Sequence, residues 1–302
     1  MATTAPPILP ATAGVQPRQH KINWPAIAWF GGLLLLCYAP ILYRMGTQWA
    51  TDENMGHGFF VPIVAGFVVW QRRDQLLATP RKPSNWGLVL IGWAALQELA
   101  GTLGAELFTA RLAFVIALFG VVLYLGGKAW LKILLFPLLL LLFMIPIPQI
   151  IYSRLTLSLQ MIASALGEWL LELMGIPVIR EGNLLRLPSQ TLDVAEACSG
   201  IRSLLSLGFL SLVYGYFADK RAWMRWALLI STVPIAIAAN GIRVALTGLM
   251  SEINTQLAQG VFHEMEGYIV FVVALAALLT LHRLLRVAAN RFGGSADKKA
   301  AA

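Results

Sequence analysis

The sequence predicts an all-α polytopic membrane protein of about eight transmembrane helices with a small cap on one membrane face. Of its 302 residues, 58% are hydrophobic and only 13% are charged, which is too much apolar surface for one soluble core. Long apolar runs such as Ile133–Ile147 and Gly267–Leu281 recur along the chain. A bilayer core about 30 Å thick takes roughly 20 helical residues to cross, so these runs indicate membrane spans.

The apolar runs predict eight spans, at about 25–43, 57–71, 86–104, 108–126, 129–147, 200–217, 224–250 and 267–285. Residues 1–24 are rich in Ala, Pro and Thr and are expected to form a flexible tail, without the apolar stretch and cleavage site of a signal peptide. Residues 25–287 then form one integral-membrane domain, and 288–302 form a second tail. The two cysteines, Cys37 and Cys198, do not suggest a disulfide framework.

Loop charge predicts the orientation of the spans. Most of the 23 basic residues fall in one set of loops: Arg18, Lys21, Arg72, Arg73, Arg81, Lys82, Lys128, Lys132, Lys220, Arg221, Arg225, Arg283, Arg286, Arg291, Lys298 and Lys299. The other loops are acidic. Because basic loops stay in the cytosol, both termini are expected there, which requires an even number of crossings. The net charge of +8 therefore reflects membrane orientation and does not indicate nucleic-acid binding.

Two segments between the fifth and sixth spans predict the cap. Ile151–Met174 places apolar residues three or four positions apart with polar residues on other faces, so it is expected to lie along the outer membrane surface. A crossing there would invert the charge pattern that follows. In Pro177–Val194, two short apolar stretches flank Glu181-Gly182-Asn183, a pattern typical of a β-hairpin.

Three reactive residues fall on the same predicted face. Cys198 stands at the start of the sixth span, where a helix N-terminus lowers a thiol pKa and favours the nucleophilic thiolate. His263, just before the eighth span, is suited to carry protons near neutral pH. Arg243, in the outer part of the seventh, could bind a substrate carboxylate or stabilise an oxyanion. Singly, each has a plainer interpretation: a packing thiol, a solvated histidine and an arginine paired with an acid.

Four further residues are weaker candidates for supporting or binding substrate: His57, Glu196, Arg202 and Asn240. His57 could instead end a short span, and Asn240 could bond a neighbouring helix. Arg202 could extend to the interface, and Glu196 could charge a helix N-terminus. His282, like His20, is interpreted as a solvated histidine.

Ordered motifs resemble the exosortase/archaeosortase family. They are Glu196-Ala-Cys-Ser-Gly-Ile-Arg-Ser203, Ala239-Asn-Gly-Ile-Arg243, His263-Glu-Met-Glu-Gly267 and Gly56-His-Gly-Phe-Phe-Val-Pro62. The resemblance implies a membrane cysteine transpeptidase with sortase-like chemistry, in which Cys198 is the nucleophile and Arg243 and His263 are its partners. It implies no metal and no other cofactor.

The resemblance also implies substrates and a location. The partners would be exported proteins with a C-terminal Pro-Glu-Pro (PEP-CTERM) signal, a membrane helix and a basic tail, and no nucleic acid. The enzyme would lie in the bacterial inner membrane with its site facing the periplasm, often alongside exopolysaccharide export. Water or an amine could resolve the acyl-enzyme. Two alternatives are a transporter, which needs polar residues through the midplane, and a non-catalytic subunit of a polysaccharide export complex.

Overall fold

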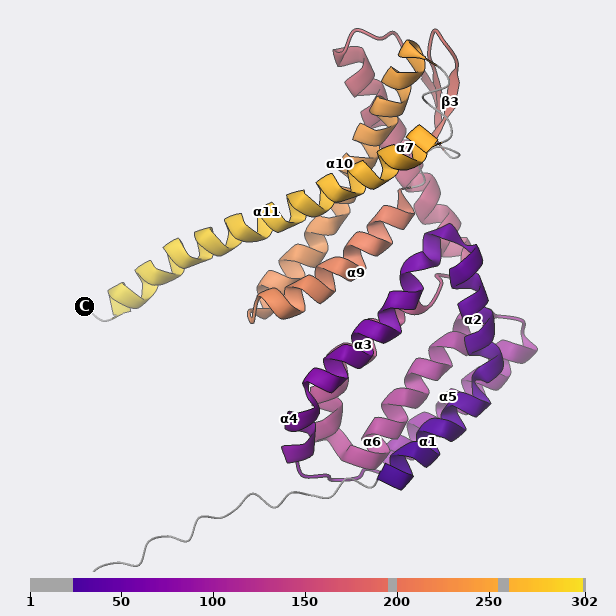
Figure 1. Cartoon of the computed structure of the whole chain (residues 1–302), viewed down its shortest axis with the longest axis vertical. Coiled ribbons are helices and arrows are strands. Elements are labelled where there is room, and N and C mark those ends of the chain that lie inside the picture. Colours follow the sequence, from indigo (N-terminus) through magenta and orange to yellow (C-terminus); the bar gives the residue numbers. More distant parts are fainter. Residues whose placement is uncertain (1–23, 195–199, 255–260, 301–302) are drawn as a thin grey trace, which may run out of the picture. The chain divides into compact units, whose positions relative to one another are not determined.

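A computed structural model describes residues 24–194, 200–254 and 261–300 (Figure 1). The chain divides into two compact units: Met1–Tyr43 with Pro62–Leu142, and Arg44–Val61 with Phe143–Ala302. We describe each unit by itself, as the first and the second unit.

The first unit is helical. Its helices are α1 (Trp24–Cys37), the start of α2 (Ala39–Thr51), α3 (Phe60–Gln71), α4 (Arg73–Ala78), α5 (Trp86–Leu103) and α6 (Leu107–Leu140), which the 3₁₀ turn η2 (Leu141–Met144) follows. Small residues let α5 and the first half of α6 approach closely. Gly87 lies against Gly120 and Gly101 lies against Ala110, so these two helices run antiparallel.

Gly127 breaks α6 into the two helices that the sequence predicts as separate spans. Its φ of 80° and ψ of −170° are not helical. The backbone of Lys82 lies directly against it, and a Cβ at residue 127 would overlap the Lys82 carbonyl oxygen. The position therefore requires glycine for both its conformation and its space.

Gly127→Ala is expected to reduce the yield of folded protein severely, since a left-handed φ alone costs about 1–3 kcal/mol and the overlap with Lys82 adds to it. The measurement is the monodisperse fraction after detergent extraction, followed by size-exclusion chromatography. Gly92→Ala is the matched control, because a Cβ at Gly92 meets nothing within 4 Å. Equal yields of the two variants would contradict the prediction.

The second unit joins three long helices to a cap. Its elements are η1 (Glu53–Phe59), α7 (Gln149–Leu173), β1 (Ile179–Glu181), β2 (Leu184–Arg186), β3 (Thr191–Asp193), α9 (Ile201–Ala218), α10 (Ala222–Ile253) and α11 (Val261–Ala300). Helices α9, α10 and α11 share a buried core of Leu207, Leu228, Ala274 and Leu278. In Figure 1, α7 and the sheet gather at the end of these helices where α9 begins and α10 ends. Helix α11 continues through most of the predicted tail.

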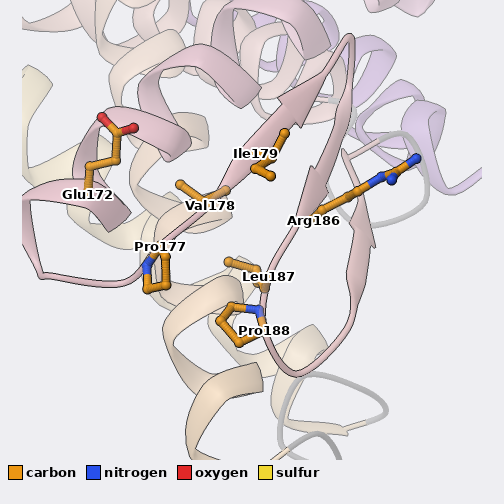
Figure 2. A pocket seen from close by; sticks show the side chains of 7 residues that line it. All are labelled: Glu172, Pro177, Val178, Ile179, Arg186, Leu187 and Pro188. Atoms are coloured by element: carbon orange, nitrogen blue, oxygen red, sulfur yellow. The ribbon is translucent and has the colours of Figure 1, made fainter.

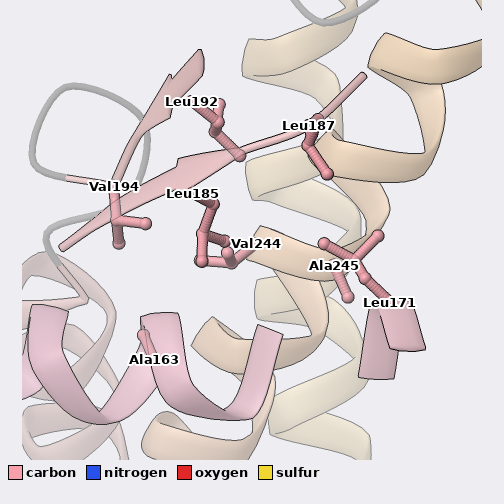
Figure 3. Close-up of a cluster of buried hydrophobic side chains, with 8 residues drawn as sticks. All are labelled: Ala163, Leu171, Leu185, Leu187, Leu192, Val194, Val244 and Ala245. Carbon is pink, nitrogen blue, oxygen red and sulfur yellow. The ribbon is translucent and has the colours of Figure 1, made fainter. Parts of the chain in front are cut away.

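The cap is a three-stranded antiparallel sheet on α7 and α10. The predicted hairpin is β1–β2, which turns at Gly182 with Glu181 opposite Leu184. β3 adds a third strand that the sequence did not predict. Figure 3 shows the buried cluster beneath the sheet: Ala163, Leu171, Leu185, Leu187, Leu192, Val194, Val244 and Ala245.

Polar contacts fasten this cap to the helices. The Ser189 N–H and Oγ donate to Glu252 Oε1 at the end of α10, at 3.0 and 2.6 Å. Arg180 Nε donates to Glu168 Oε2 of α7 at 2.6 Å. The sheet is therefore held by both helices and not by apolar packing alone.

Helix α7 packs closely along the last part of α10. Gly241 lies against Leu166, and Gly248 lies against Leu171, so the two helices advance in the same direction there. Among the described helices, α7 is not one of those long and apolar enough to cross a membrane. That agrees with the prediction that it does not cross, while its predicted orientation along the surface stays a prediction.

The all-α membrane fold is confirmed, but the count of eight spans is not. Within the described residues, five helices are long and apolar enough to cross: Trp86–Leu103, Leu107–Met144, Ile201–Ala218, Ala222–Ile253 and Met265–Arg291. A sixth results if Pro25–Cys37 and Ala39–Thr51, bent by 67°, count as one span. The predicted span at 57–71 contains only a 12-residue helix, α3, which at about 18 Å is shorter than the bilayer core.

Candidate active site

The start of α9 packs on Asn240 of α10. Gly200, the residue before α9, adopts a left-handed conformation with φ 68°. A Cβ at this position would lie 2.8 Å from Asn240 Nδ2, so only glycine allows the contact. Asn240 is buried, with 6% of its surface exposed. This contact brings the motif that contains Cys198, two residues before Gly200, to the motif that contains Arg243.

The Arg243 side chain joins α10 to α11. Its guanidinium carbon lies 3.2 Å from where a Cβ of Gly267 would stand. His263 precedes Gly267 by about one helical turn in α11. We call the meeting point of Gly200, Asn240, Arg243 and Gly267 the three-helix junction.

Two residues that the sequence analysis did not single out lie beside the junction. Thr247, one turn after Arg243, is fully buried, and its Oγ1 donates to Glu266 Oε2 at 2.8 Å. Glu266 is only 8% exposed. Glu266 directly precedes the predicted span at 267–285, so the signal available in the sequence was an acid at the edge of a span, where burying a charge is costly.

The structure describes the three predicted catalytic residues to different extents. Arg243 lies at the junction as described above. The backbone of His263 lies in α11, but its side chain is outside the described residues. Cys198 and Glu196 lie entirely outside the described residues. The structure thus brings together segments that adjoin all three motifs, and the reactive geometry itself remains a prediction.

Helix lengths are compatible with a junction near one boundary of the bilayer core. From Ala222 to Arg243, α10 rises about 32 Å at 1.5 Å per residue, and α9 rises about 27 Å over its length. A hydrocarbon core is about 30 Å thick. With the first turn of α10 at one boundary of that core, the turns after Arg243 and the cap would extend past the other boundary, where an extended peptide chain can be solvated.

His57 lies away from the junction. Its Nε2 donates to the Phe143 carbonyl oxygen at 3.2 Å, and its ring centre is 6.3 Å from that of Phe209. Phe209 is about 13 Å further along α9 than Gly200. Burial lowers the pKa of His57, which favours the neutral ring. These contacts favour a packing role. Arg202, in the first turn of α9, has an exposed side chain.

A second polar cluster lies where α9 ends and α10 begins. His282 of α11 is only 2% exposed, so its interpretation as a solvated histidine was wrong. Its Nδ1 lies 2.7 Å from Tyr214 Oη, and its Nε2 lies 3.7 Å from Asp219 Oδ2. Hydrogen bonds from the Arg221 side chain hold the pKa of Asp219 well below its usual range. The cluster therefore joins α9, α10 and α11 at the end of the bundle away from the three-helix junction.

The cap contains a cavity beside its sheet. The cavity measures about 520 Å³ and lies between the end of α7 and β2 (Figure 2). Its lining is mostly apolar, formed by Glu172, Pro177, Val178, Ile179, Arg186, Leu187 and Pro188. Among the described residues, no group of three or more His, Cys, Asp or Glu side chains could hold a metal ion.

Comparison with known proteins gives one match. The model of the family described as transmembrane exosortase matches residues 49–280, which is well over half of the chain. No curated protein and no solved structure matches it. The matched range holds the junction, the cap and most of the apolar helices, as the motifs predict. The chain therefore belongs to the transmembrane exosortase family, whose members are generally membrane cysteine proteases or transpeptidases.

Proposed function

We propose that this exosortase is a cysteine transpeptidase that cleaves a C-terminal sorting signal of exported proteins. The observation that carries the proposal is the three-helix junction. There Gly200, two residues after Cys198, meets Asn240, and Gly267, four residues after His263, meets the Arg243 guanidinium. The substrate's own membrane helix would reach the site through the bilayer. Its extended segment would then lie at the cap, near the membrane boundary.

The proposed reaction has two balanced steps. The Cys198 thiolate attacks the carbonyl carbon of the scissile peptide, so that a C–S bond forms, the C–N bond breaks and His263 protonates the leaving amine. Arg243 stabilises the oxyanion of the tetrahedral intermediate. Water or an amine then attacks the thioester and loses a proton, and the C–S bond breaks to restore the thiolate.

The substrates proposed are exported proteins with a Pro-Glu-Pro-type motif, a membrane helix and a basic tail. Their processing would accompany exopolysaccharide export. The proposed location is the bacterial inner membrane, with the junction facing the periplasm. The alternative of a non-catalytic export subunit predicts that no covalent intermediate forms. Mixing the purified protein with such a substrate and measuring intact mass decides between them, since only the transpeptidase gains an acyl group on Cys198.

Thiol labelling tests the proposed orientation. In a protein with Cys37→Ala and Cys198→Ala, a cysteine at Gln190 is expected to react with a membrane-impermeant maleimide in intact spheroplasts. A cysteine at Arg81 should react only after the membrane is permeabilised, because basic loops stay in the cytosol. The reverse pattern would contradict the orientation and, with it, the periplasmic site.

Substitutions of Arg243 and His263 separate their roles. Arg243→Lys is expected to reduce cleavage strongly, since lysine keeps the charge but loses the forked geometry of the guanidinium. His263→Ala should lower the rate by roughly 10²–10⁴-fold, the usual range for general acid–base catalysis. The measurement is a gel-shift time course of substrate cleavage. His57→Ala is the control, because His57 lies away from the junction and should retain far more activity.

A further inference from the structure

We infer that Glu266 and Thr247 are positioning residues that hold the Arg243 guanidinium at the junction. This inference rests on the proposed function. It adds two residues from different helices to the site and gives them one shared task.

The first step is the burial of Glu266. This carboxylate is 8% exposed and lies in the part of α11 that can cross the membrane. An acid within a span is expensive and is therefore by default a functional candidate with a polar or charged partner. Thr247 provides a hydrogen bond at 2.8 Å from the facing helix α10.

The second step is where Arg243 lies relative to this pair. Its guanidinium rests on Gly267, with the carbon and Nη2 both 3.2 Å from where a Cβ would stand. Gly267 directly follows Glu266, and consecutive Cα atoms are about 3.8 Å apart. The cation thus lies over the residue that adjoins the buried carboxylate. A carboxylate and a guanidinium attract each other more strongly where the surroundings exclude water, so the buried Glu266 favours a guanidinium held on this side of α11.

The third step is the geometry of Thr247. It is one turn after Arg243 on α10, and its Oγ1 lies 3.0 Å from the Arg243 carbonyl oxygen as well as 2.8 Å from Glu266. One hydroxyl has one proton, and the Glu266 carboxylate oxygen is the nearer of its two acceptors. The bond then fixes the carboxylate against the same helical turn that carries Arg243. Arginine has a long, flexible side chain, so such a support keeps its fork aimed at one place.

Four variants of the full-length protein test this role in one series with the wild type and Cys198→Ala. Thr247→Val and Glu266→Gln are expected to lower kcat by about tenfold or more with little change in KM, because they disturb a group that acts in the transition state. Thr247→Ser keeps the hydroxyl and should stay within about twofold of wild type. The double variant Thr247→Val/Glu266→Gln should have a kcat no lower than that of the slower single variant, since both residues belong to one interaction.

A merely structural cross-link between α10 and α11 would behave differently. The thermal unfolding temperature would then fall for Thr247→Val and Glu266→Gln, while kcat per folded molecule would stay at the wild-type value. That result, or a Thr247→Ser variant as slow as Thr247→Val, would overturn the inference while Cys198→Ala remains inactive. Cleavage by Cys198→Ala would instead overturn the proposed function, and the positioning role with it.

Discussion

Cys198→Ala and Cys198→Ser are both expected to abolish cleavage of a sorting-signal substrate, with a loss of roughly 10⁴-fold or more. The reaction needs a thiolate that attacks and later leaves. A serine hydroxyl has a much higher pKa and does neither well without a strong base. The measurement is accumulation of uncleaved substrate by gel shift, at equal membrane abundance of each variant.

Cys37→Ala is the matched control for the Cys198 variants. Cys37 is an exposed free cysteine on α1, in the first unit and outside the junction motifs. The Cys37→Ala variant should therefore cleave the substrate like the wild type. Near-normal cleavage by Cys198→Ala would end the transpeptidase proposal and support the role of a non-catalytic export subunit.

Gly200→Ala is expected to reduce cleavage by about one to two orders of magnitude, because displacing a catalytic group by about 1 Å can cost 10²-fold. A Cβ there would press on Asn240 Nδ2 at 2.8 Å and would strain a φ of 68°. The start of α9 would have to move away from α10. Since Cys198 lies two residues before Gly200, the reactive segment would move with it.

Gly182→Ala separates backbone strain from this displacement. Gly182 has the same φ of 68° in the β1–β2 turn, but a Cβ there would meet nothing within 4 Å. Both variants are expected to lose a similar, small amount of stability from strain, about 1 kcal/mol. Only Gly200→Ala should lose activity, measured as kcat/KM of folded protein. Equal activity of the two variants would show that the contact with Asn240 does not matter for cleavage.

The sequence predicted the local features well, because local patterns encode them. Hydropathy located the long helices, and the spacing of apolar residues identified α7 as an amphipathic helix. The turn at Gly182 predicted the hairpin β1–β2. The motif pattern placed the chain in its family. The count of eight spans is not confirmed, since the predicted span at 57–71 contains only the 12-residue helix α3.

The sequence by itself determined that this is a helical membrane protein with an exosortase motif set and a small cap. The tertiary structure alone decided that Gly200 rests on Asn240, that Gly267 rests under Arg243, and that Glu266 is bonded to Thr247. It also decided that His282 is buried with Tyr214. Each of these contacts joins residues from different helices. Hydropathy and periodicity report which face of a helix is apolar, but the partner on that face depends on how the helices pack.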